Sequence, residues 1–260
     1  MRAPDRFLDR VRASTVDDVR TVDLRAVDWV TPTVMVAVAA QAQHAAAHGT
    51  AFAVRAPARA EPGSYAARMR LGAVLDSLGA RHDLPVRRTE RDQRTNLVEL
   101  SEVAREADAS RLAALVHRKL RSQDSRLADA LHASIGEIGV NVPDHATTVG
   151  YMAAQTLPRR NTLLVAVADA GVGLLHTLRK RGADTDEHAI DLAMRPDVSE
   201  YDDPSRGAGL PTVLRLVRGL GGSVYLASGA AAIRHHARTR RYTSAAQPLV
   251  GTIVEIRIPL

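Results

Sequence analysis

A carboxylate and a carboxamide stand four residues apart in this chain, at Glu137 and Asn141. Apolar residues recur around them at helical spacing, so both side chains are expected on one face of a helix. The amide oxygen of Asn141 suits a hard cation such as Mg²⁺, and the Glu137 carboxylate can accept a proton from an attacking water or hydroxyl. The pair indicates chemistry on a magnesium-bound triphosphate; an ordinary polar helix face is the alternative.

A second acid follows an apolar, strand-like run, where Asp169 precedes Gly171 and Gly173. A carboxylate buried there needs a partner, because burial without one costs on the order of several kcal/mol. An exocyclic amine would supply that partner. Glycines at 171 and 173 let the backbone approach a ligand closely and adopt positive φ. A tight strand-to-helix turn without a ligand is the alternative.

A third motif, Arg206-Gly207-Ala208-Gly209-Leu210, opens another apolar helical run. The unpaired amides and the dipole of a helix N-terminus favour a phosphate group. Gly207, Gly209 and Leu210 are therefore expected beside phosphate, within reach of Arg206. A simple N-terminal turn explains the same residues.

In this order and spacing, the three motifs resemble the nucleotide site of the GHKL ATPases and kinases, the superfamily of gyrase, Hsp90, histidine kinases and MutL. The resemblance covers residues 102–260, because Gly221-Gly222 and the final run Gly251–Pro259 also match that family's pattern. It implies an α/β fold, a GHKL two-layer sandwich with a mixed sheet, which binds ATP and Mg²⁺.

The resemblance also implies roles for individual side chains. Asp169 would read adenine, with Thr252 joining the polar network on the adenine side. Asn141 would hold the metal, and Glu137 would be the catalytic base. Residues 174–206 would form a mobile lid over the phosphates.

The N-terminal part resembles a STAS domain, the fold of the anti-anti-sigma factors that are partners of GHKL serine kinases. The matching features are Val22–Arg25, the turn Thr31-Pro32-Thr33, and an Ala-rich helix that ends at Gly49. Thr33 falls at the position of the phosphorylated serine, but the aspartate and glycine of that family's turn are absent. A helix N-cap is the alternative role for Thr33, so we expect a docking or regulatory module.

Alternating strand and helix patterns predict two α/β units. Residues 1–92 would form the STAS-like domain and residues 102–260 the ATP-binding domain, with a boundary in the polar stretch 80–101. Strands are predicted at 21–24, 28–30, 51–55, 162–168, 223–228 and 251–259, and helices at 33–48, 64–78, 102–120, 127–141, 189–195 and 210–220.

Composition narrows the classes of function. The absence of cysteine excludes disulfides, thiolate zinc sites and cysteine nucleophiles, and no P-loop pattern occurs. Aromatic residues make up only 3%, which argues against a base-stacking surface despite a net charge of +6. The longest apolar stretch, residues 34–47, is too short and polar to span a bilayer. We expect a cytoplasmic protein with no membrane association.

The basic run 234–241 is expected as a solvated loop, with an acidic or nucleic-acid partner as the alternative. A nucleic-acid partner is otherwise not expected. The sequence therefore predicts an ATP-Mg-binding regulatory protein with a protein partner, acting as an ATPase or as a serine/threonine kinase resembling anti-sigma-factor kinases. A non-catalytic, nucleotide-gated binding switch is the alternative. A homodimer is compatible with the sequence, which leaves the oligomeric state and the phospho-acceptor open.

Overall fold

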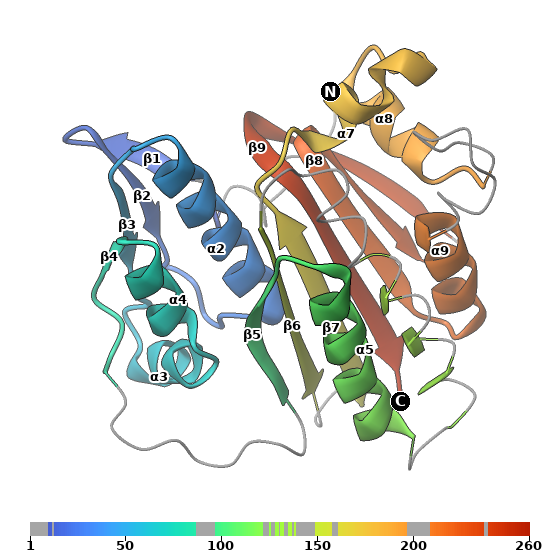
Figure 1. The fold of residues 1–260 in the computed structure, drawn as a ribbon, viewed down its shortest axis with the longest axis horizontal. Coiled ribbons are helices and arrows are strands. Elements are labelled where there is room, and N and C mark those ends of the chain that lie inside the picture. Colours follow the sequence, from blue (N-terminus) through green and yellow to red (C-terminus); the bar gives the residue numbers. More distant parts are fainter. Residues whose placement is uncertain are drawn as a thin grey trace.

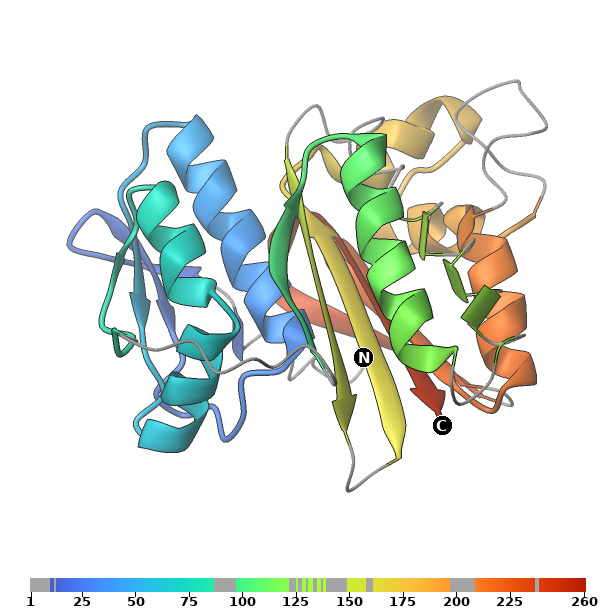
Figure 2. The same cartoon turned by 60° about the horizontal axis from the view of Figure 1, so that its bottom comes forward.

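Two β-sheets and their helices stack in four layers (Figures 1 and 2). The structure is a computed structural model that describes residues 10–11, 13–86, 97–121, 149–157, 161–196, 209–236 and 239–260, together with 125, 128–129, 131–132, 135–136 and 138. A four-stranded sheet forms one outer layer. A helical layer separates it from a five-stranded sheet, whose other face is covered by further helices. The predicted α/β class is confirmed.

The four-stranded sheet has the order β1-β2-β3-β4, with β1 antiparallel to β2 and the other neighbours parallel. Arg70 has a φ of +67° and splits the helix predicted at 64–78 into α3 and α4. The predicted strand at 28–30 is irregular backbone instead. The elements of this unit are β1 (Ala13–Val16), β2 (Val19–Asp23), α2 (Pro32–Ala47), β3 (Phe52–Arg55), α3 (Ala60–Arg68), α4 (Leu71–Ser77) and β4 (Arg81–His82).

The five-stranded sheet has the order β5-β6-β7-β9-β8, and its described strands all pair antiparallel, whereas a mixed sheet was predicted for this part. The helix predicted at 102–120 starts only at Glu106, because residues 97–103 form the edge strand β5. Its elements are β5 (Leu97–Val103), α5 (Glu106–Leu120), β6 (Gly150–Leu157), β7 (Thr162–Asp169), α7 (Gly173–Leu178), η2 (Arg179–Arg181), α8 (Asp186–Ala193), α9 (Gly209–Gly219), β8 (Ser223–His236) and β9 (Arg240–Pro259).

Helix α2 lies between the two sheets (Figure 2). Its residues from Pro32 to Ala42 are all buried, and a helix that is apolar on every side is typical of a fully buried position. On one side it packs with Val22 and Val54 of the small sheet, and on the other with Ala166 and Ile253 of the large sheet. The two units therefore share one hydrophobic core.

The opposite face of the large sheet carries a second core, beneath α5 and α9 (Figure 1). Val165 and Val254 belong to it, and so do Leu131, Ile135 and Ile138 from the helix predicted at 127–141. The described residues between 128 and 138 are helical, in agreement with that prediction. The helix preceding Asn141 thus covers the same sheet face as α9.

Strands β8 and β9 form a long hairpin that doubles back. Arg234 donates a hydrogen bond to Glu255, and its guanidinium carbon lies 4.7 Å from the centre of the Tyr225 ring. Nine extended residues would span roughly 30 Å, so the strand must fold back between positions 225 and 234. Residues 234–236 and 240–241 are strand rather than the predicted loop. The far half of the hairpin also packs on α8, where Tyr242 donates a hydrogen bond to Asp191.

Within the described ranges, no helix combines the length and apolar character needed to cross a lipid bilayer.

Candidate functional site

Asp169 and Thr252 stand at neighbouring strand ends of the large sheet. Strands β7 and β9 pair antiparallel as far as Ala168, and the next position of that register puts Thr252 opposite Asp169. Directly opposed side chains point to the same face. Val167 and Val254 are buried in the core beneath α5 and α9, so the alternation of side chains directs both polar residues toward that helical layer.

The turn after β7 orients the Asp169 carboxylate. Its Oδ1 accepts a hydrogen bond from the Gly171 N–H at 2.8 Å. Gly173 has a φ of +76°, as predicted, whereas Gly171 lies outside the left-handed region and serves as a donor. Across the strands, a β-carbon on Gly251 would lie 2.1 Å from the Asp169 carbonyl oxygen. The close approach of the Gly251 backbone therefore helps to fix the position of this carboxylate.

Helix α9 begins at Gly209, in agreement with the predicted helix N-terminus. Gly209 is buried, and the half-buried Leu210 packs against the core beneath α5 and α9. The first turn of α9 carries no acidic residue, so no carboxylate on it opposes an anion at the N-terminal amides. The described part of the third motif suits phosphate.

Four predicted site residues, Glu137, Asn141, Arg206 and Gly207, lie outside the described residues. Their roles stay predictions. The structure does describe neighbouring helical residues. Ile138 precedes Asn141, and α9 begins at Gly209, two residues after Gly207. Both elements pack on the sheet face toward which Asp169 and Thr252 are directed.

Residues 174–206 were predicted to form a mobile lid. Their described part, 174–196, is instead regular and packed structure. It forms α7, η2 and α8, which enclose a small apolar cluster around Leu178 and Leu192. The Asp186 carboxylate accepts a hydrogen bond from the Ala230 N–H at 2.8 Å. This part of the segment is therefore packed and anchored to β8.

Thr33 is fully buried on the other face of the large sheet, where its hydroxyl donates a hydrogen bond to Glu255. It is not the helix N-cap. Thr31 caps α2 by accepting a hydrogen bond from the Val34 N–H at 3.4 Å, one residue before the helix starts at Pro32. The candidate acceptor and the candidate nucleotide residues therefore face opposite sides of the large sheet.

Glu255 is a functional candidate that the sequence analysis missed. Its side chain is 2% exposed, yet Arg234 and Arg257 pair with it at 2.8 and 2.7 Å. Burial raises the pKa of Glu255, but the hydrogen bond from Arg257, the two positive charges and the Thr33 hydroxyl outweigh it and hold the pKa below the usual value. A lone acid within the apolar run 251–259, two residues from an arginine, was the available signal.

The C-terminal end of α2 contacts the turn after Asp169 from the sheet face that is opposite to α5 and α9. The His44 ring forms a hydrogen bond with the backbone of Ala170, while burial, and then the nearby His48 and Arg20, lower the pKa of His44. Tyr151 on β6 donates a hydrogen bond to Gln43 at 3.0 Å. The small unit thus touches the backbone of the second motif.

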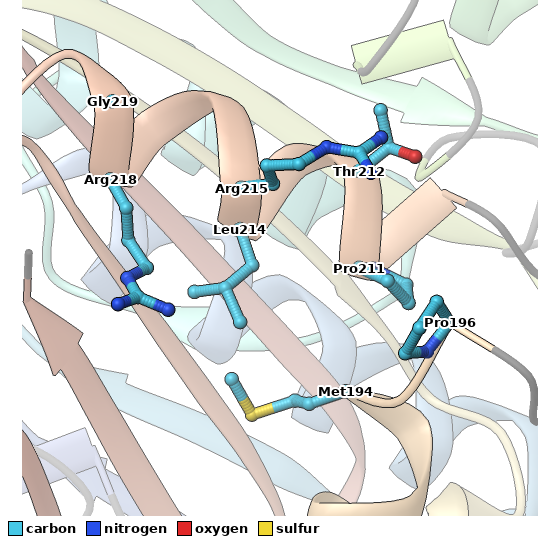
Figure 3. Close-up of a pocket in the computed structure, with 8 residues that line it drawn as sticks. All are labelled: Met194, Pro196, Pro211, Thr212, Leu214, Arg215, Arg218 and Gly219. Carbon is cyan, nitrogen blue, oxygen red and sulfur yellow. The ribbon is translucent and has the colours of Figure 1, made fainter.

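A separate pocket of about 660 Å³ lies between α9 and the end of α8 (Figure 3). Leu214 of α9 points toward Met194, Pro211 lies beside Pro196, and Arg215 and Arg218 of α9 also line the pocket. Of the predicted site residues that the structure describes, none lines this pocket. It is therefore distinct from the edge formed by Asp169 and Thr252.

Among the residues that the structure describes, no group of three or more histidine, aspartate or glutamate side chains is arranged to hold a metal ion. No protein-family model matches the chain, and comparison with curated proteins finds no match.

Proposed function

We propose that the chain is an ATP-Mg-binding regulatory protein of the GHKL type, with ATPase or serine/threonine kinase activity and a protein partner. The observation that supports this proposal most directly is the neighbouring placement of Asp169 and Thr252, at the next position beyond the paired register of β7 and β9. They stand at adjacent strand ends and are directed toward one helical layer. The elements adjoining the first and third motifs pack on that same face.

Each residue has a defined part in this proposal. Asp169 accepts a hydrogen bond from the exocyclic amine of adenine, with its carboxylate held by the Gly171 N–H. The N-terminal amides of α9 hold phosphate. When bound to Asn141, Mg²⁺ neutralises phosphate charge. Glu137 accepts the proton of the attacking water or hydroxyl.

Replacing Asp169 with asparagine tests the nucleotide site. The substitution adds a donor that faces the adenine amine and removes a charge-assisted hydrogen bond worth about 1.5–3 kcal/mol. We expect ATP affinity, measured by titration calorimetry, to fall roughly 10- to 100-fold. Asp184→Asn, on an exposed side chain paired with His188, is the matched control and should bind like the wild type. Equal affinity in both variants would reject the assignment.

The first motif is tested by separating binding from turnover. Asn141→Ala should abolish magnesium-dependent ATP binding while the circular dichroism spectrum stays unchanged. Glu137→Ala should keep ATP binding and lose turnover. Undiminished nucleotide affinity in the first variant, or retained turnover in the second, contradicts the assigned role.

A non-catalytic, nucleotide-gated switch is the second candidate. The position of Thr33 favours it over phosphoryl transfer within the chain, because that hydroxyl is fully buried on the opposite sheet face. Incubation with γ-labelled ATP separates the possibilities. Released phosphate identifies an ATPase, label on an added protein or on the chain identifies a kinase, and binding without either identifies a switch.

A further inference from the structure

Ser228 links the two backbone segments that carry Asp169 and Thr252. The serine lies in β8 and is 1% exposed. Its Oγ accepts a hydrogen bond from the Leu174 N–H at 2.9 Å and donates one to the Gly251 carbonyl at 3.1 Å. One hydroxyl therefore joins the start of α7 to the residue immediately before Thr252.

The space around this hydroxyl is tightly filled. A β-carbon on Gly173 would lie 2.9 Å from Ser228 Oγ, and a β-carbon on Gly251 would lie 2.7 Å from Asp169 Oδ1. Strand pairing puts Ser228 directly opposite Thr252. A shift of either segment would therefore alter the spacing between the Asp169 carboxylate and the Thr252 hydroxyl.

A serine hydroxyl suits this position chemically. It donates once and accepts through two lone pairs, so it satisfies one backbone N–H and one backbone carbonyl together. An alanine would remove this partner from both groups, of which one contact is buried and the other partly buried. Local relaxation of the turn is the expected response.

We propose that Ser228 is a positioning residue that determines the selectivity of the site for a 6-aminopurine. It acts by holding the Asp169 turn against the strand that carries Thr252, and it does not itself touch the nucleotide. This inference rests on the proposed function, because it concerns the same nucleotide edge.

The test compares Ser228→Ala with Ser223→Ala in the full chain. Ser223 is a matched control, since it lies in the same strand and is 5% exposed. Affinities for ATP and inosine triphosphate, both with magnesium, are measured by calorimetry. Inosine triphosphate carries an oxygen where ATP carries the amine, so the ratio of the two affinities reports the Asp169 contact.

We expect the wild type and Ser223→Ala to prefer ATP, and Ser228→Ala to lose about tenfold in that preference, the size of one hydrogen bond. A general loss of stability would lower both affinities and leave the ratio unchanged, which would overturn the inference. If Ser228→Ala does not fold, Ser228→Cys keeps a similar volume with only a weak donor and acceptor, and the same loss is expected.

The two proposals fail differently. A wild-type chain that binds neither nucleotide refutes the proposed function and the selectivity role with it. A wild-type chain that prefers ATP, beside a Ser228→Ala variant with the same preference, refutes the role of Ser228 alone.

Discussion

At the scale of single residues, Gly251 is a position where the backbone of β9 lies directly against Asp169 at the end of β7. Its φ is +70°, and an added β-carbon would lie 2.1 Å from the Asp169 carbonyl oxygen and 2.7 Å from the carboxylate Oδ1. Only glycine satisfies both the backbone conformation and the contact. The position of the Asp169 carboxylate therefore depends on a residue without a side chain.

Gly251→Ala should lower the free energy of unfolding by about 3 kcal/mol or more, since it combines left-handed strain with a steric clash. Gly49→Ala is the control. Gly49 also has positive φ, at +62°, but nothing lies within 4 Å of its added β-carbon, so a loss of about 1–2 kcal/mol is expected. Urea denaturation measures both, and equal losses would contradict the close approach.

Sequence alone was sufficient to predict the strand that ends near Asp169, the positive φ of Gly173 and the final strand that carries Thr252, because these are local patterns. The nucleotide roles of Asp169 and Thr252 stay predictions. The sequence was not sufficient to find Ser228 or Glu255. The partners of Ser228 include Leu174, 54 positions away, and Glu255 accepts from Thr33, 222 positions away. No local pattern encodes contacts at such separations.

At the scale of elements, the returning β8–β9 hairpin builds a buried ionic cluster. It brings Arg234 to Glu255, which also pairs with Arg257 and with Thr33 of α2. Removing one partner from a buried ion pair costs about 3–5 kcal/mol, because the remaining charges stay buried and uncompensated. Glu255 therefore ties together the hairpin, the sheet and the N-terminus of α2.

This cluster should make stability depend on pH. The pKa of folded Glu255 is lowered, so its stabilising contribution is complete above the unfolded pKa and is lost as pH falls through the folded pKa. At pH 7 the free energy of unfolding of the wild type should exceed that of Glu255→Gln by about 3 kcal/mol. This difference should become smaller as the pH falls from 5 to 3. Chemical denaturation at each pH measures it.

The exposed Glu61→Gln should show no comparable gap at any pH. A gap between the wild type and Glu255→Gln that stays constant down to pH 3 would contradict an ionised Glu255 in the folded protein.

Elements were predicted best where apolar residues had a clear period. The helices at 33–48 and 210–220 and the strand at 162–168 agree with α2, α9 and β7 to within one residue at every end. Strand β5 was read as part of a domain boundary, because charged and polar residues interrupt its apolar side. The sequence predicts a loop at 234–241, the far half of the β8–β9 hairpin, because the run is strongly basic. Arg234 pairs with Glu255 only because the strand folds back, and the local sequence does not show this.

At the scale of the whole molecule, the two units share the core built around α2. Separating them would expose the buried surface of that helix and one face of the large sheet. Tyr65 of α3 also donates a hydrogen bond to Gln155 of β6 at 2.6 Å. The predicted domains are therefore expected to unfold together.

Trp29, the single tryptophan, provides the test. It stacks on Tyr65, with ring centres 4.9 Å apart, and so reports the small unit. Its fluorescence and the far-ultraviolet circular dichroism of the whole chain should give coincident urea transitions, as for one cooperative unit. A fluorescence midpoint at clearly lower urea would show that the small unit unfolds independently.

The position of α2 also has a consequence for synthesis on the ribosome. The helix is complete once residue 47 has emerged, but β9, which covers it and supplies the Glu255 partner of Thr33, emerges some 200 residues later. At 5–20 residues per second, its apolar surface waits roughly 10–40 s for that strand. During that interval the part of α2 that β9 covers in the folded protein stays exposed on the nascent chain.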